Sequence, residues 1–266
     1  MGESPSLPVL LIRATENERD ALALGTFGFK TVIDPYLSIQ PLEQKDAALA
    51  GAKLYRELAL LGRNDWVIVT SSNALKYWSE SYGPGSLSRE LKSAAKLGVR
   101  FAAVGKTSEK VFSELGITEV LTPQISTSEQ LAEELLALNF RTGTALIPAG
   151  NLALAGIGTK LSGAGWSVKN SIIYRTMAVE VRPASVDDVD GGKFSAVVFR
   201  SPSAARAFAR WNPVTEGSQS AKLPVVCGGP TTAEAARQLG LNVVAVASSP
   251  DSDSVASATS KYFKKL

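Results

Sequence analysis

The sequence contains no histidine and a single cysteine, Cys227, in 266 residues. Without histidine the chain lacks the side chain that most often serves as a general base and as a metal ligand near neutral pH. A single cysteine excludes an internal disulfide and argues against a metal cluster held by thiolates. Any chemistry must therefore rest on tyrosine, lysine, carboxylate, hydroxyl or backbone groups, and we expect no metal site.

Long apolar runs and blocks of like charge are also missing. No run approaches the roughly 18 apolar residues that a membrane span requires, and residues 1–6 do not resemble a signal peptide. The 28 Lys and Arg and the 25 Asp and Glu are interspersed and give a net charge of only +3. No basic stripe is interleaved with aromatic residues. We therefore expect no membrane partner, no nucleic-acid partner and a cytoplasmic location.

Short apolar segments alternate with helical segments along the whole chain. This alternation predicts an α/β fold with parallel sheets flanked by helices. A Gly-, Pro- and Ser-rich stretch at 81–88 is expected to be a loop, and Thr15 is the expected N-cap of the first helix. The expected strands are 7–13, 29–33, 66–70, 101–104, 119–123, 144–148, 171–182, 194–199, 223–227 and 243–246.

The two halves of the chain repeat one set of signals. Segment 69–74 aligns with 199–204, 104–108 with 228–232, 128–131 with 252–255, and 10–13 with 145–148. The alternative is that parallel α/β proteins look alike by construction. If the repeat is real, the first strand of one unit lies at the N-terminus and the rest of that unit follows residue 180.

This interpretation gives a division into domains. Residues 1–35 and 180–266 form a discontinuous α/β domain, and residues 42–170 form a second one. The connecting strands, 36–41 and 171–179, are expected to lie side by side. Because pockets favour the junctions of domains, we single out Tyr174 in the second connector.

Polar residues follow four of the expected strands, and each group opens a helix. Helix N-termini present free backbone N–H groups and positive dipole ends, so together they predict a set of anion sites. The alternative for each group alone is a simple N-cap. No group matches a phosphate-binding P-loop or a dinucleotide-binding glycine motif. The candidate residues are Ser71, Ser72, Asn73, Lys106, Thr107, Ser201, Ser203, Gly229, Thr231 and Thr232.

Seven short motifs, in order, resemble the uroporphyrinogen-III synthase family. They lie at 10–13, 35–42, 66–74, 101–108, 173–176, 197–203 and 229–234 and span almost the whole chain. The resemblance implies two similar α/β domains with parallel sheets flanked by helices, joined by a two-stranded β-ladder. The chain departs from the family pattern at Arg200, where Thr or Ser is usual, and at Cys227-Gly228.

The resemblance also implies an activity: cofactor-free closure of the linear tetrapyrrole hydroxymethylbilane, with inversion of ring D and loss of water. Tyr174 is then the candidate proton donor or hydroxyl orienter. The candidate residues at the helix N-termini, together with Arg13 and Arg200, would bind the substrate's carboxylates. We expect a monomer that takes its substrate from the preceding enzyme of the pathway. The rival interpretations are a non-catalytic binder of an anionic small molecule and a regulatory domain of the same fold.

Overall fold

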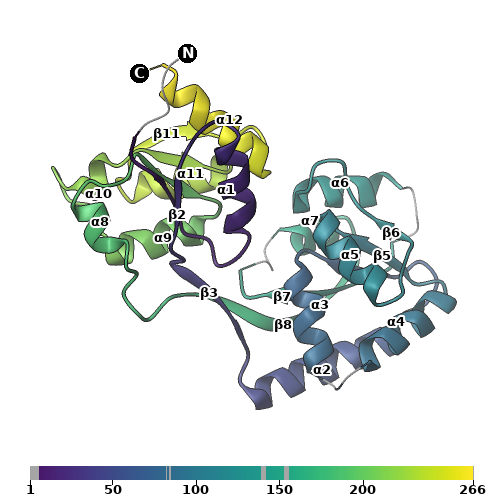
Figure 1. Cartoon of the computed structure of the whole chain (residues 1–266). Helices are drawn as coiled ribbons and strands as arrows, with labels where there is room; N and C mark the ends of the chain where they lie inside the picture. Colours follow the sequence, from purple (N-terminus) through teal and green to yellow (C-terminus); the bar gives the residue numbers. More distant parts are fainter. Residues whose placement is uncertain (1–5, 82, 84, 139–141, 153–155, 266) are drawn as a thin grey trace. The chain divides into compact units, whose positions relative to one another are not determined.

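The strands of the chain form two sheets, each belonging to its own unit. The computed structural model describes residues 6–81, 83, 85–138, 142–152 and 156–265. One unit comprises Met1–Ser38 with Met177–Leu266, and the other comprises Ile39–Thr176. We call them unit 1 and unit 2 (Figure 1). The polypeptide therefore starts unit 1, builds all of unit 2, and returns to finish unit 1.

Unit 1 contains a five-stranded parallel sheet in the order β11-β10-β9-β1-β2. Every residue of β1, β9 and β10 is buried, as expected for parallel strands that are covered on both faces. The strands are β1 (Val9–Leu11), β2 (Thr31–Ile33), β9 (Ala196–Phe199), β10 (Val225–Cys227) and β11 (Val243–Val246).

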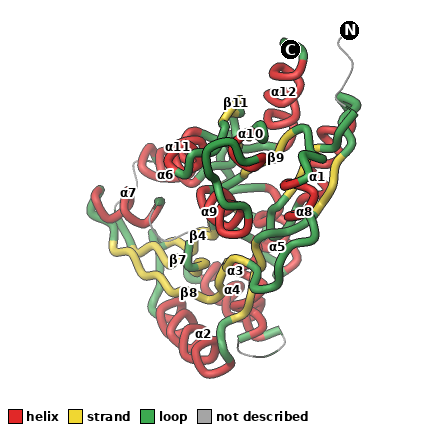
Figure 2. The backbone as a smooth tube through the Cα atoms, turned by 90° about the vertical axis from the view of Figure 1, so that its left-hand side faces the viewer, coloured by secondary structure: helices red, strands yellow, loops and turns green. Residues whose placement is uncertain are grey.

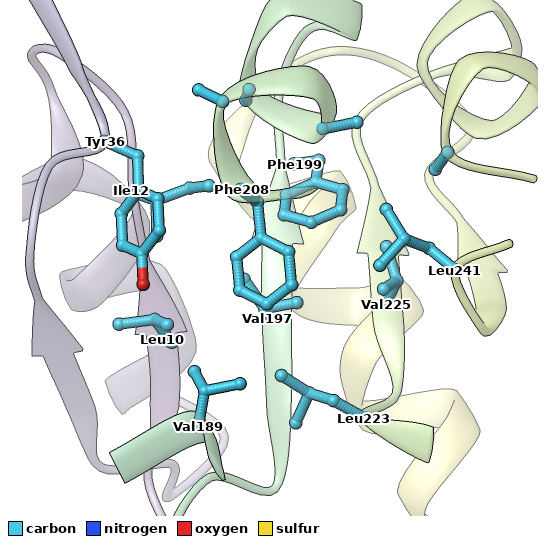
Figure 3. Close-up of a cluster of buried hydrophobic side chains, with 14 of the residues drawn as sticks. Leu10, Ile12, Tyr36, Val189, Val197, Phe199, Phe208, Leu223, Val225 and Leu241 are labelled. Atoms are coloured by element: carbon cyan, nitrogen blue, oxygen red, sulfur yellow. The ribbon is translucent and has the colours of Figure 1, made fainter. Parts of the chain in front are cut away.

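Helices cover both faces of this sheet. Apolar residues of α8, α9 and α11 pack on one face, and those of α1 and α12 pack on the other. Figure 3 shows the first of these cores, where Phe208 lies against Val197 and Phe199. The helices are α1 (Asn17–Gly25), α8 (Val186–Asp190), α9 (Pro202–Trp211), α10 (Gln219–Lys222), α11 (Pro230–Gln238) and α12 (Ser252–Phe263).

Unit 2 contains a six-stranded sheet in the order β3-β8-β7-β4-β5-β6. Helices α2 to α5 supply the core on one face, and α6 and α7 supply it on the other. Its strands are β3 (Leu37–Pro41), β4 (Trp66–Val69), β5 (Arg100–Ala103), β6 (Val120–Leu121), β7 (Thr144–Gly150) and β8 (Ser167–Ala178). Its helices are α2 (Gln44–Ala59), α3 (Ser72–Glu80), α4 (Ser86–Lys96), α5 (Lys106–Glu114), α6 (Ser128–Ala137) and α7 (Ile157–Gly163).

The repeat seen in the sequence is a structural repeat. The order β11-β10-β9-β1-β2 of unit 1 corresponds strand for strand to β6-β5-β4-β7-β8 of unit 2, which adds β3 at one edge. Ser71 and Ser201, aligned in the sequence, are the N-caps of α3 and α9, and each follows the middle one of the five corresponding strands. Gly105 and Gly229 are likewise the N-caps of α5 and α11. The mixed α/β fold with parallel sheets is therefore confirmed.

The two connectors are neighbours. Strands β3 and β8 are hydrogen-bonded to each other at the edge of the unit 2 sheet, and Val179 N donates to Tyr36 O at 3.0 Å. The Tyr36 side chain is fully buried in the core of unit 1, where its ring stacks on Phe208 (Figure 3). Its hydroxyl lies 3.1 Å from Ser185 Oγ and accepts from Asn212 Nδ2 at 3.3 Å. Tyr36 therefore anchors the start of β3 to unit 1.

Three local expectations were wrong. The stretch expected to be a loop at 81–88 includes the start of α4, which the Gly and Ser residues concealed. Helix α1 begins at Asn17 rather than after a Thr15 cap, because Asn17 exchanges two hydrogen bonds with the backbone of Arg13 and closes a turn first. Strand β8 begins at Ser167, four residues earlier than expected, because it pairs along the whole of β7. Among the described residues, no helix is long and apolar enough to cross a membrane.

Candidate functional site

The first candidate site lies in unit 2 where the strand order reverses. From β4 the chain crosses over to β5 and β6, whereas from β7 it crosses to β8 on the other side. Ligands of parallel α/β sheets bind at the carboxyl ends of the strands beside such a switch point. At this point β4 leads into the N-terminus of α3, and β7 ends at Gly150. We call the residues at the carboxyl ends of β4, β7 and β8 the unit 2 site.

Ser71 is the N-cap of α3, whose N-terminus belongs to this site. Its Oγ accepts from Asn73 N at 3.3 Å, and Asn73 Nδ2 points to the same oxygen at 3.4 Å. Ser71, Ser72 and Asn73 are all half-buried, so the helix N-terminus keeps contact with solvent. The group therefore serves as an N-cap, and it also presents the positive end of the α3 dipole.

Tyr174, on β8, lies in the same site. Its side chain is only 5% exposed, its hydroxyl hydrogen-bonds with Ser71, and its ring stacks on Tyr77 with centroids 5.6 Å apart. Burial raises the pKa of Tyr174 above its usual value, and the hydrogen bond with Ser71 opposes that shift in part. The phenol is therefore neutral near pH 7, and a neutral phenol can donate a hydrogen bond or a proton but is a poor base.

Two neighbours of Tyr174 were missed in the sequence. Gly150 ends β7 beside it and Asn151 follows, and Asn151 N donates to Tyr174 O at 3.3 Å. Figure 2 shows β7 and β8 running side by side in this sheet. The sequence signal that could have identified them is a Gly-Asn pair close after an apolar strand. It was overlooked because the expected strand ended at residue 148.

The second helix N-terminus of unit 2 carries Lys106 and Thr107 at the start of α5, after β5. Lys106 Nζ donates to Glu109 Oε2 at 2.8 Å, and its side chain is 84% exposed. Hydrogen bonds from Lys106 and then Thr122 hold the pKa of the Glu109 carboxyl below its usual value. Lys106 therefore has a carboxylate partner within the chain, and Thr107 is half-buried in the first turn.

In unit 1 the switch point lies between β1 and β9, and a buried carboxylate occupies it. Asp20 on α1 is 1% exposed and accepts from Arg13 Nη1 at 3.4 Å and from Ser252 Oγ at 2.6 Å. It also accepts from Arg200 Nη1. Arg13 donates in addition to Glu16 at 2.8 Å. We call Arg13, Glu16, Asp20, Arg200 and Ser252 the Asp20 cluster.

Arg200 makes contacts through both of its terminal nitrogens. Its second terminal nitrogen donates to Pro250 O, and its side chain is 10% exposed. Burial lowers the pKa of Arg200, whereas the charge of Asp20 opposes that change. A Cβ at Gly228 would lie 3.1 Å from Arg200 Nε, so the absence of a side chain at 228 leaves room for the guanidinium. Arg200, one of the departures from the family pattern, thus fits beside Gly228.

The helix N-termini of unit 1 hold the remaining candidates. Ser201 caps α9 by accepting from Ala204 N at 3.3 Å, and its hydroxyl lies 2.8 Å from Ser203 Oγ. Gly229 precedes α11 in extended conformation. Thr231 in the first turn is exposed, whereas Thr232 is only 4% exposed and faces the protein. Thr231 is therefore the accessible hydroxyl of this pair.

Three cavities lie away from these helix N-termini. In unit 1 one of about 260 Å³ lies between β11 and α12, and another of about 680 Å³ lies beside α1. In unit 2 a cavity of about 380 Å³ lies between α2 and α4. Among the described residues, no group of three or more His, Cys, Asp or Glu side chains is placed to hold a metal ion. The polar N-termini, rather than these cavities, carry the candidate chemistry.

Comparison with known proteins adds a decisive match. A model of the family uroporphyrinogen-III synthase HemD matches residues 18–257. The chain belongs to the uroporphyrinogen-III synthase family. A protein of rice (Oryza sativa subsp. japonica) named chloroplastic uroporphyrinogen-III synthase is 31% identical over 196 residues. That match covers 71% of this chain and 60% of the rice protein, so the chain spans less than two thirds of that relative.

Solved structures of the family share the fold. A mutant uroporphyrinogen III synthase of Thermus thermophilus superposes with a TM-score of 0.57 at 14% identity, covering 97% of this chain and 100% of that one. The uroporphyrinogen-III synthetase of Helicobacter pylori gives a TM-score of 0.57 at 14% identity, covering 95% and 98%. At this identity the likeness concerns the fold, which agrees with the architecture described above.

Proposed function

We propose that this chain is a uroporphyrinogen-III synthase, a cofactor-independent lyase of porphyrin and haem biosynthesis. It takes the linear tetrapyrrole hydroxymethylbilane, releases water, and closes the ring with ring D inverted. Membership of the family supports this reaction class. The observation that carries the proposal is the buried, neutral hydroxyl of Tyr174 at the N-terminus of α3, beside the switch point of unit 2.

The Tyr174 hydroxyl is suited to help the leaving group depart. It donates its proton to the terminal hydroxyl of the substrate, which leaves as water, while the pyrrole nitrogen supplies electrons to form an azafulvene cation. The hydrogen bond with Ser71 and the dipole of α3 stabilise the phenolate that remains. Ring D attacks this cation from its substituted carbon and gives a spiro intermediate, which fragments and recloses with ring D inverted. The ring D carbon that closes the macrocycle then loses its proton, and the phenolate takes that proton back.

The N-termini of helices are suited to hold the carboxylates of this substrate, which carries an acetate and a propionate on every pyrrole. The net charge of the protein is only +3, so binding needs local sites rather than overall attraction. We assign carboxylate binding first to the starts of α3 and α5 in unit 2 and of α9 and α11 in unit 1. Arg13, Arg200 and Lys106 take second place, because each already has a carboxylate partner.

Substituting Tyr174 tests this assignment. Tyr174→Phe removes one hydroxyl and should lower kcat by about 10²–10⁴-fold with substrate affinity nearly unchanged, because general acids contribute that much. Tyr36→Phe is the matched control, since it also removes one buried hydroxyl but lies in the core of unit 1. If Tyr174→Phe keeps wild-type kcat, Tyr174 is not the acid. If the wild-type protein binds hydroxymethylbilane without turnover, the chain is a binder of anionic tetrapyrroles.

Three further parts of the proposal concern the protein's setting. We propose that it works as a monomer, receives hydroxymethylbilane from the enzyme that makes it, and resides in the cytoplasm. A single buried cysteine suits a reducing compartment, although the rice relative is named as chloroplastic. Sedimentation, substrate-trapping assays with the preceding enzyme, and cell fractionation test the three points separately.

A further inference from the structure

The pairing of β7 and β8 changes register just before Tyr174. The two strands pair residue for residue from Thr144↔Ser167 to Ala149↔Ile172, and then Gly150 pairs with Tyr174. Ile173 is the extra residue of a β-bulge. In a regular strand, consecutive side chains point to opposite faces. Here Ile173 and Tyr174 are both buried in the same core of unit 2, so the bulge turns Tyr174 onto the face that carries α3.

Asn151 holds the strand in place after the bulge. Thr176 N donates to Asn151 Oδ1 at 2.8 Å, and Asn151 Nδ2 donates to Thr176 O at 3.3 Å. The side-chain amide thus takes the place of the next residue of β7 in the sheet ladder. Together with the bond from Asn151 N to Tyr174 O, these contacts fix the backbone on both sides of Arg175.

Gly150 sets the height of the Tyr174 ring above the sheet. A Cβ at Gly150 would lie 2.5 Å from Tyr174 Cζ, 2.6 Å from Cε2 and 2.8 Å from Oη. These distances are far below van der Waals contact, so the ring rests directly on the Gly150 backbone. The ring also stacks on the ring of Tyr77. Any side chain at 150 must push the Tyr174 hydroxyl away from Ser71.

We propose that Gly150 and Asn151 are positioning residues that place the Tyr174 hydroxyl at the N-terminus of α3. Gly150 provides the space for the ring, and Asn151 locks the bulge that aims it. This inference deepens the proposed function, since it explains how the fold holds the group assigned as the proton donor.

The test combines a titration and a double-mutant cycle. In Gly150→Ala the displaced hydroxyl loses part of its burial, so the pKa of Tyr174 should fall back towards 10. The titration of Tyr174 is measured as the difference in ultraviolet absorbance between Gly150→Ala and the same variant that also carries Tyr174→Phe. Turnover of hydroxymethylbilane should fall about 10²-fold in kcat, with little change in KM. In the Tyr174→Phe background, Gly150→Ala should cause almost no further loss of kcat. Gly163→Ala is the control, because a Cβ there meets nothing within 4 Å.

A second variant covers the case in which Gly150→Ala fails to fold. Asn151→Ala adds no clash and should shift the Tyr174 titration and kcat in the same directions, and Asn151→Asp, which keeps the acceptor for Thr176 N, should restore part of both. An unchanged titration in both Gly150→Ala and Asn151→Ala overturns the inference, whether or not the chain is active. A shifted titration with wild-type kcat supports the positioning and instead overturns Tyr174 as the donor.

Discussion

Removing the charge of Asp20 should strongly destabilise unit 1. Asp20→Asn keeps the shape of the side chain but leaves Arg200, whose side chain is 10% exposed, without its anionic partner. Arg13 suffers less, because Glu16 remains 2.8 Å away. A buried ion pair that loses one partner typically costs about 3–5 kcal/mol, which is a large part of the roughly 5–15 kcal/mol that stabilises a domain. We therefore expect Asp20→Asn to lower the free energy of unfolding of unit 1 by about 3–5 kcal/mol.

Urea unfolding measures this loss. Separate units can unfold in separate transitions, so the probe must report on unit 1. Trp211 is the one tryptophan in the sequence of that unit, and its fluorescence can be isolated by replacing the other three of the four tryptophans with phenylalanine. Asp188→Asn is the control: it breaks an exposed pair with Lys193, whose side chain is 67% exposed, and should cost no more than about 1 kcal/mol.

A double variant shows whether the loss arises from the pair itself. Asp20→Asn combined with Arg200→Gln removes both charges, so it should cost at least about 1 kcal/mol less than the sum of the single variants. The reasoning is refuted if Asp20→Asn costs no more than Asp188→Asn, or if the two single losses simply add.

Three other properties follow from buried groups. Burial raises the pKa of the Cys227 thiol to about 12, so the native protein should resist a thiol-specific disulfide reagent near pH 8; rapid labelling of one equivalent without denaturant would contradict this. Burial also raises the pKa of Tyr36 and Tyr174 above 10.0. The neutral phenols therefore stabilise the fold fully below pH 10, and this stabilisation is lost as the pH rises through the raised values. The free energy of unfolding should fall less between about pH 9 and 11 in Tyr174→Phe than in the wild type. An equal fall in the two proteins would contradict a contribution of Tyr174 to the pH dependence. Tyr36→Phe should cost about 1–3 kcal/mol in urea, because Asn212 and Ser185 lose a buried partner; an unchanged unfolding midpoint would show that these bonds contribute nothing.

The repeated α/β architecture was accessible from the sequence for a physical reason. Parallel strands covered on both faces are short and wholly apolar, as at Trp66–Val69 and Ala196–Phe199, and a polar N-cap follows each. These signals are local, so they can be recognised in the sequence without knowledge of the fold. Similar signals in matching places of the two halves then indicated the repeat.

The partners of charged and aromatic side chains were not accessible in this way. Arg200 pairs with Asp20 across 180 residues of sequence, and nothing near Arg200 indicates a carboxylate. Arg13 and Arg200 remain predicted substrate-binding residues, but the sequence did not reveal that both pair with Asp20. The bulge at Ile173 depends on the register between β7 and β8, which only the assembled sheet determines. Tertiary contacts therefore decided the details of the site, while local patterns decided the elements that carry it.

The most direct test of the account is the isomer of the product. Hydroxymethylbilane is generated in the assay, the protein is added, the products are oxidised, and the uroporphyrin isomers are separated. The account predicts mostly isomer III, since the protein must enforce the inversion of ring D. Mostly isomer I, as forms in the blank without protein, would contradict the proposed activity.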